Sequence, residues 1–70
     1  MTPVRVTANG DEVDLPDGAA LTDLLERLGL GQKWVVVERN GEPVERAAMS
    51  AVTLADGDRL EIVRAVAGGT

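Results

Sequence analysis

Hydrophobic and polar side chains alternate with a period of two near the start of the chain, over residues 4–8 and again over residues 12–15. This spacing puts alternate side chains on opposite faces of a strand and predicts two strands, each with one buried face. Asn9-Gly10 lies between them. Asn-Gly is the strongest two-residue hairpin signal, because both positions tolerate a positive φ. The chain is therefore expected to open with a β-hairpin.

The spacing of hydrophobic residues changes after the turn residues 16–18. Leucines recur at positions 21, 24, 25 and 28, which lie on one face of an α-helix of about ten residues. Asp17 is the nearest upstream residue that can cap this helix. Ala20 stands three residues before Asp23, the spacing of a capping box, although Ala20 has no side-chain oxygen. Gly29 is expected to end the helix, since glycine readily adopts the left-handed C-cap conformation.

The second half of the chain predicts three further strands. Residues 33–39 form a β-branched run that ends at a second Asn-Gly pair, Asn40-Gly41. Pro43 restricts the short return strand to an edge of the sheet, because proline lacks a backbone donor. A single helical turn is expected over residues 46–50, and alternation over residues 60–63 predicts the last strand.

A hairpin, one amphipathic helix and then more strands indicate an α+β fold, in which one main helix covers one face of a mixed sheet of four to five strands. The β-grasp fold satisfies this pattern. The right-handed crossover rule favours a central last strand that runs parallel to the first. The expected core consists of Val4, Val6, Val13, Leu15, Leu21, Leu24, Leu25, Leu28, Leu54, Leu60 and Ile62.

The later strands carry more hydrophobic residues than one covered face can bury. Central strands often read as continuous hydrophobic runs, which is one explanation. The other is that part of the uncovered face binds a partner. The candidate docking residues are Val35, Val37, Val63 and Ala65. The pattern leaves open whether Trp34 and Val36 or Val35 and Val37 face outward, and Trp34 is expected in the core or at its edge.

The composition excludes most catalytic chemistry. The chain has 70 residues, with 12 Asp or Glu, 7 Lys or Arg and a net charge of −5, and it has no His, Cys or Tyr. An enzyme acting alone and a Cys/His metal site are therefore not expected. The carboxylate clusters, among them Asp56 and Asp58, are expected in solvated turns and on strand faces.

The charge balance and hydropathy also limit the classes of partner that this chain can bind. An acidic chain is a poor ligand for nucleic acid and favours a basic protein partner. No hydrophobic run approaches the length of a membrane span, and no signal sequence is evident. We expect a cytoplasmic protein that is a monomer when free and that binds neither nucleic acid nor membrane.

Two adjacent glycines, Gly68-Gly69, follow the last predicted strand closely. A frayed terminus would explain them. Behind a β-grasp body, however, they are similar to the tail that ubiquitin-like proteins insert into a partner's active site, and glycines without Cβ suit a narrow channel. Residues 66–69, fully extended, reach about 13 to 14 Å. We expect a β-grasp domain over residues 1–66 and a flexible tail over residues 67–70.

Four stretches of the sequence resemble the ThiS family, the sulfur carrier proteins of thiamine biosynthesis. They are residues 24–30, 37–42, 54–63 and 65–69, and the last two are the most specific. The resemblance implies that the carboxylate of Gly69 is adenylated by an E1-like adenylyltransferase, which consumes ATP. It implies a thiocarboxylate made with sulfur from a cysteine desulfurase or rhodanese-type donor and delivered to thiazole synthase. Val66, Ala67 and Gly68 would form the tail, and no bound cofactor is implied.

Two positions depart from the family pattern. Met49 stands where many members carry tryptophan. Thr70 follows Gly69, so that the Gly69 carbonyl is an amide that cannot be adenylated directly. Either a peptidase removes Thr70, or the residue was added in cloning, or it marks a natural variant in an inactive precursor; the sequence leaves these explanations open.

Other roles fit the same pattern. The chain could carry sulfur for molybdopterin, cysteine or a secondary metabolite. It could also be an inert β-grasp interaction module or a ubiquitin-like modifier, although its sole lysine, Lys33, disfavours a chain-forming modifier.

Overall fold

The computed structural model describes residues 2–64. Five strands form one mixed sheet in the order β2-β1-β5-β3-β4. The strands are β1 (Val4–Ala8), β2 (Asp11–Leu15), β3 (Val35–Arg39), β4 (Glu42–Val44) and β5 (Arg59–Arg64). The helices are α1 (Leu21–Arg27) and the 3-10 helices η1 (Gln32–Trp34) and η2 (Arg46–Ala51). Strand β5 is central, parallel to β1 and antiparallel to β3, as the crossover rule predicts.

Both Asn-Gly pairs form the predicted hairpin turns. In the first, φ is 53° at Asn9 and 88° at Gly10, and in the second it is 52° at Asn40 and 87° at Gly41. A positive φ at both central residues is the signature of a type I′ turn, whose twist matches that of the flanking strands. Strand β4 lies at the sheet edge, where the missing donor of Pro43 does not interrupt a ladder.

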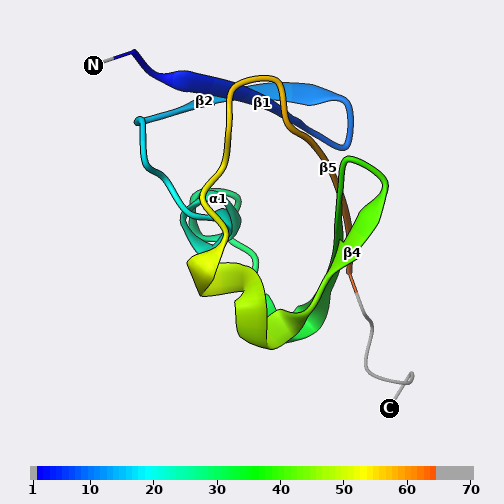
Figure 1. Cartoon of the computed structure of the whole chain (residues 1–70). Coiled ribbons are helices and arrows are strands. Elements are labelled where there is room, and N and C mark those ends of the chain that lie inside the picture. The colour runs from blue at the N-terminus through cyan, green and yellow to red at the C-terminus, as the bar shows by residue number, and fades with distance from the viewer. Residues whose placement is uncertain (1, 65–70) are drawn as a thin grey trace.

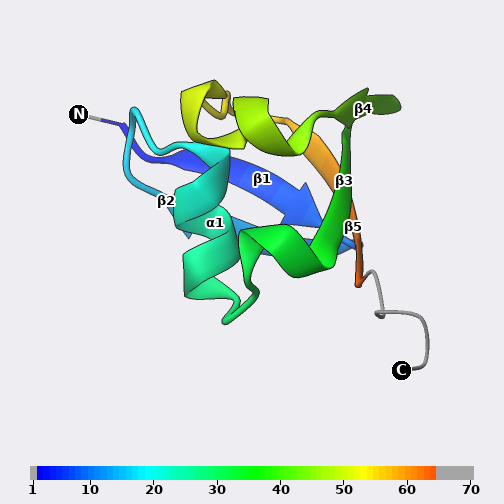
Figure 2. The same ribbon diagram turned by 90° about the horizontal axis from the view of Figure 1, so that it is seen from below.

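The sheet curves around α1, and η2 lies on the same side of it (Figures 1 and 2). Side chains on this concave face alternate with exposed ones along β1, β3 and β5. The buried hydrophobic core consists of Val4, Val6, Ala8, Leu15, Ala19, Leu21, Leu24, Leu25, Val35, Val37, Met49, Leu54, Leu60 and Ile62. Val13, predicted in the core, is partly buried and packs against it. One covered face leaves the other face of the sheet open.

Helix α1 is shorter than predicted, and Leu28 is not a core residue. The helix ends at Arg27, and Leu28 is its C-cap and is 40% exposed. The Gly29 N–H donates to the Glu26 carbonyl (3.0 Å) and the Leu30 N–H to the Leu25 carbonyl (2.8 Å), which makes a Schellman motif around a Gly29 φ of 73°. Leu30 instead packs against the core. The leucine spacing runs one residue past the end of the helix.

The N-terminus of α1 forms half of a capping box. The Asp23 carboxylate accepts a hydrogen bond from the Ala20 N–H at 2.8 Å. Ala20 is the N-cap, and because it has no side-chain acceptor the reciprocal bond is replaced by the backbone contact from the Asp23 N–H to the Ala20 carbonyl at 2.9 Å. The spacing of Ala20 and Asp23 therefore marks the helix start, and Asp17 lies before it.

Candidate functional site

The uncovered face of the sheet carries a pair of exposed hydrophobic residues. Val36 in β3 and Val63 in β5 are direct cross-strand partners. They are 51% and 61% exposed, whereas Val35 and Val37 are almost fully buried on the other face. The pairing of Val37 with Ile62 places both in the core. The outward phase of β3, which the sequence left open, is therefore that of Val36.

This arrangement corrects the predicted docking set. Val35 and Val37 are core residues that a partner cannot contact, so their assignment to a docking surface is wrong. Val63 is exposed, as docking requires, and Ala65 lies outside the described residues. Val36 was missed. Leu60 and Ile62 fix the inward phase of β5, but that phase reaches β3 only through the pairing register of the two strands, which the structure supplies and the sequence does not.

Trp34 is 53% exposed and is not part of the core. It belongs to η1, and the strand begins one residue later at Val35. Its indole lies against the backbone of Gly31, where an added Cβ would be 2.9 Å from the Trp34 Cδ1. The prediction of a core position is wrong because the chain turns through η1 before it enters the sheet, so Trp34 does not continue the strand alternation.

Ion pairs cover the part of the open face formed by β1 and β2. The Arg5 Nε donates to the Asp14 Oδ1 at 2.8 Å, and its Nη1 lies 3.8 Å from Glu12. The hydrogen bond from Arg5 lowers the pKa of the Asp14 carboxyl, and the bond to Asp14 raises the pKa of the Arg5 guanidinium. Both side chains are exposed, so water screens the pair. The exposed pair Val36 and Val63 therefore lies on the other half of the open face, which β3 and β5 form.

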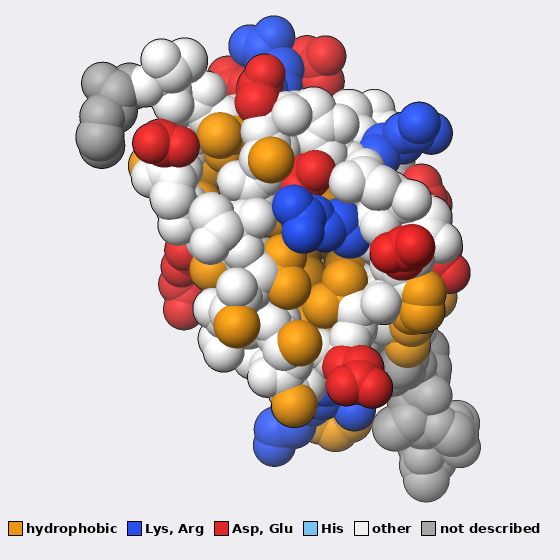
Figure 3. Space-filling model, in the orientation of Figure 1, with side chains coloured by type: hydrophobic (Ala, Val, Ile, Leu, Met, Phe, Trp, Pro, Cys, Tyr) orange, Lys and Arg blue, Asp and Glu red, His pale blue; other side chains and the backbone are white. Residues whose placement is uncertain are grey.

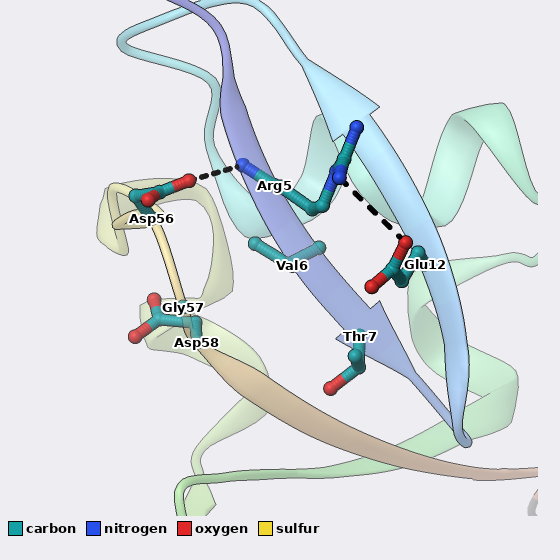
Figure 4. A pocket seen from close by; sticks show the side chains of 7 residues that line it. All are labelled: Arg5, Val6, Thr7, Glu12, Asp56, Gly57 and Asp58. Atoms are coloured by element: carbon teal, nitrogen blue, oxygen red, sulfur yellow. Dashed lines mark hydrogen bonds and ion pairs between the residues drawn. The ribbon is translucent and has the colours of Figure 1, made fainter.

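A hollow of about 220 Å³ lies beside β1, where the Asp56-Gly57 turn meets Arg5 and Glu12 (Figure 4). The Arg5 N–H donates to the Asp56 Oδ1 at 2.7 Å. Thr7 also lines the hollow, and its buried Oγ1 has no hydrogen-bond partner within the described residues. The Gly57 N–H also donates to the Arg5 carbonyl at 2.8 Å, so that backbone bonds of Arg5 fasten the turn to β1.

Asp58, just before β5, is the one buried charged side chain among residues 2–64. Its carboxylate accepts hydrogen bonds from the Ala55 N–H (2.8 Å), the Asn40 Nδ2 (3.0 Å) and the Arg39 Nε (3.0 Å). Burial opposes the charge, but these bonds outweigh it and hold the pKa of Asp58 below its ordinary value. Asp58 is thus not the solvated turn residue that was expected. It ties the β3–β4 hairpin to the beginning of β5.

The remaining charges are dispersed. On the face shown in Figure 3, Lys and Arg side chains are separated from one another by acidic, hydrophobic and other groups. Across residues 2–64, no three acidic side chains lie close enough to hold a metal ion. Over the same residues, no helix is long and apolar enough to cross a membrane.

Comparison with known proteins assigns the family. A family model described as the ThiS family matches residues 2–69. The chain belongs to the ThiS family. The sulfur carrier protein ThiS of Bacillus subtilis is 40% identical over 62 residues, with 87% of this chain and 94% of that protein covered. A thiazole synthase of Paramagnetospirillum magneticum is 36% identical over 67 residues, which are 96% of this chain but 21% of that protein.

Solved structures of the ThiS family share the fold. A crystal structure of the thiamine biosynthesis protein ThiS from Geobacter metallireducens matches with a TM-score of 0.76 and 36% identity, covering 94% of this chain and 100% of that one. A solution structure of a thiamine biosynthesis protein from the same organism gives 0.75 and 37%, covering 96% and 90%. The solved structures confirm the predicted β-grasp fold. Together with the family match and the Bacillus subtilis relative, they confirm the prediction of a ThiS sulfur carrier of thiamine biosynthesis.

The predicted reacting residue and its neighbours lie outside the described residues. They are Val66, Ala67, Gly68 and Gly69, and the expected boundary between domain and tail falls there too. The family match nevertheless extends through Gly69 and stops before Thr70. The candidate site on the described body is therefore the Val36–Val63 pair, at the end of the strand that precedes the glycines.

Proposed function

We propose that the reacting group of this ThiS-family carrier is the carboxylate of Gly69, exposed by removal of Thr70. The family match that ends at Gly69 carries this proposal. A carboxylate becomes a good electrophile only when one of its oxygens joins a good leaving group, and AMP is such a group. The chain has no His or Cys with which to perform this step. An E1-like adenylyltransferase therefore supplies ATP and orientation, and the carrier is its protein substrate.

Sulfur then replaces AMP on Gly69. The terminal sulfur of a persulfide on a cysteine desulfurase or rhodanese-type protein attacks the acyl-adenylate, displaces AMP and forms an acyl disulfide. A thiol then reduces this disulfide, which leaves a thiocarboxylate on Gly69 and a new disulfide between the thiol and the donor, and thiazole synthase accepts the sulfur. The thiazole synthase relative supports the last step, because most of this chain is similar to one part of that longer protein. A segment similar to this carrier within a protein named thiazole synthase supports a link between the two functions. It favours thiamine over the molybdopterin, cysteine and secondary-metabolite pathways.

The Val36–Val63 pair is the docking surface that presents the tail. Gly69 follows Val63 by six residues, a distance of about 20 Å if they are fully extended. A partner that covers the two valines is thus close enough to receive Gly69 in an enclosed active site. Val36 and Val63 are exposed and do not belong to the core, so a docking role explains why apolar residues stand at these two positions.

Intact-mass measurements test the role of Gly69. The 70-residue protein and a form that ends at Gly69 are each incubated with ATP, the adenylyltransferase and a sulfur donor. We expect the Gly69-ending form to gain the mass of an oxygen-to-sulfur exchange, and the 70-residue form to gain it only after losing threonine.

A form that ends at Gly68 is the matched control and should stay unmodified, because its tail is one residue too short. If the Gly69-ending form never gains sulfur, the carrier proposal is wrong. If the 70-residue form gains sulfur while it retains Thr70, the proposed removal of threonine is wrong instead.

A further inference from the structure

The Val36–Val63 pair stands where the sheet is only two strands wide. The ladder between β1 and β5 ends at Leu60, and the ladder between β3 and β4 begins at Val37. Among the described residues, the last two pairs of β3 with β5, Val36–Val63 and Val35–Arg64, therefore have no third strand beside them. We call these four residues the two-stranded end. A two-stranded ribbon twists more than a wider sheet and is marginally stable by itself, so this end needs further support to keep one orientation.

Asn9 gives the two-stranded end a support that no third strand provides. Its Nδ2 donates to the Ile62 carbonyl at 2.9 Å, and its Oδ1 accepts from the Ile62 N–H at 2.7 Å. A side-chain amide has the same donor and acceptor as a peptide group, so it takes the place of the next residue of β1 after that strand has turned. Within residues 2–64, these are the last hydrogen bonds between the β1–β2 hairpin and β5 on the way to Gly69.

The turn itself does not require this amide. Glycine and aspartate also suit the first central position of a type I′ turn, where φ at Asn9 is 53°. Glycine has no side-chain donor or acceptor, and an ionised aspartate has no donor for the Ile62 carbonyl. Of these three residues, only asparagine combines the turn conformation with both bonds to Ile62. The identity of residue 9 is thus explained by what it does for β5.

We propose that Asn9 is a positioning residue for the reaction at Gly69, because it holds the two-stranded end in the orientation in which a partner binds Val36 and Val63. The inference rests on the proposed function, in which these valines dock the carrier and Gly69 reacts. Asn9 acts through Ile62 in the free carrier, seven residues before Gly69. The orientation is therefore set before any partner binds, and no binding energy is spent on ordering the strand end.

The kinetics of adenylation test this role. In the Gly69-ending carrier, Asn9→Gly keeps the turn conformation and removes both bonds to Ile62. Pyrophosphate release by the adenylyltransferase is measured at a temperature at which the variants are folded. We expect KM for the carrier to rise about threefold to tenfold, because only the fraction of carriers with an ordered strand end binds well. The kcat should stay within about twofold of the parent, since the bound carrier presents the same Gly69.

The matched control is Asn40→Gly, at the same position of the other Asn-Gly turn, where φ is 52°. This variant also loses two side-chain bonds, to Asp58 and to the Arg59 N–H, but at the opposite end of β5. Its KM should stay within about twofold of the parent even though it is less stable, because distant sites act independently. An equal rise of KM in both variants would show a general loss of stability and overturn the proposal. Unchanged KM in Asn9→Gly would overturn it as well.

Amide hydrogen exchange in the free carrier separates positioning from a direct contact between Asn9 and the enzyme. Successive residues of a strand direct their backbone groups to opposite sides, so Val63 faces β3 and not Asn9. In Asn9→Gly, the Val63 N–H should exchange about tenfold faster relative to the slowest core amides, which report global unfolding. In Asn40→Gly this ratio should match the parent. A higher KM without faster exchange at Val63 would mean that the enzyme contacts Asn9 itself, which contradicts the positioning role.

Failure of the proposed function has a different signature. The parent carrier would then cause no pyrophosphate release and gain no sulfur at Gly69. The exchange measurement needs no enzyme, so it still decides whether Asn9 holds the two-stranded end. Normal sulfur loading of the parent, with equal KM and equal exchange at Val63 in the parent and both variants, would reject the role of Asn9 alone.

Discussion

Asp58 is a single buried residue that helps to align β3 with β5, the two strands that carry Val36 and Val63. A buried carboxylate is costly unless partners satisfy it. Here Arg39 comes from the end of β3, Asn40 from the following turn and Ala55 from the segment before β5. All three bond to one side chain at the beginning of β5. The alignment of β3 with β5, and hence of Val36 with Val63, depends in part on this carboxylate.

We predict that Asp58→Asn lowers the free energy of unfolding by about 2 to 4 kcal/mol, because the amide cannot accept all of these bonds and leaves Arg39 without its countercharge. Urea denaturation measures the change. Asp17→Asn, in an exposed turn, is the control and should change stability by less than about 0.5 kcal/mol. Equal stability of both variants would show that the Asp58 network contributes nothing.

The same variant should alter the acid limb of the stability profile. The pKa of Asp58 is lowered in the folded protein, so the stabilisation is complete above the unfolded-state value of about 3.9 and is lost as pH falls through the lower folded value. The Asp58→Asn protein should therefore lose less stability than the parent between about pH 4 and pH 2. Asp14, whose pKa is also lowered, is present in both proteins and cancels from the comparison.

Among the elements, β5 is held by hydrogen bonds from both hairpin turns. The ladder between β1 and β5 covers only Thr7–Arg59 and Ala8–Leu60. Asn9 extends it, since its Nδ2 donates to the Ile62 carbonyl (2.9 Å) and its Oδ1 accepts from the Ile62 N–H (2.7 Å). The Oδ1 of Asn40 accepts from the Arg59 N–H at 2.9 Å. Asn9 and Asn40 thus each adopt the positive φ of their own hairpin turn and also form hydrogen bonds with the backbone of β5.

Helix α1 offers an element-scale test at its C-terminus. At Gly29 φ is 73°, and an added Cβ would meet nothing within 4 Å, so the cost of a side chain is confined to the backbone. Gly29→Ala should lower stability by about 1 to 2 kcal/mol in thermal or chemical denaturation. Gly29→Asn is the matched control and should cost about half as much, since asparagine tolerates the left-handed region better. An equal loss of stability in the two variants would mean that steric contacts of the new side chain, and not the positive φ at position 29, cause the loss.

At the scale of the whole molecule, local signals predicted the fold well. The Asn-Gly pairs placed both hairpins, and chain-crossover handedness placed β5 at the centre. One prediction failed for a local reason and others because they depended on distant contacts. Leu28 has the right spacing for the core, but the helix ends at Arg27 and the chain reverses at Gly29, the residue after Leu28. Asp58 looks like a turn residue until Arg39, nineteen residues earlier, reaches it. The consecutive valines 35–37 could not reveal which of them faces outward.

Val36 faces outward and Val37 faces the core, so the same valine-to-threonine substitution can be made on either face of β3. Comparing the two positions distinguishes a role in partner binding from a role in core packing. Threonine has nearly the shape of valine and suits strands, so Val36→Thr/Val63→Thr on the open face should keep stability within about 0.5 kcal/mol. It should weaken binding to the adenylyltransferase about tenfold, measured by titration calorimetry, because two apolar contacts become polar.

The same change one position away provides the control. Val37→Thr buries a hydroxyl in the core and should cost about 1 to 3 kcal/mol of stability. At temperatures where it is still folded, it should bind the adenylyltransferase normally, since Val37 is fully buried and its side chain cannot reach a partner. If the outward pair instead lowers stability and leaves binding intact, the exposed valines serve the sheet and the docking surface lies elsewhere.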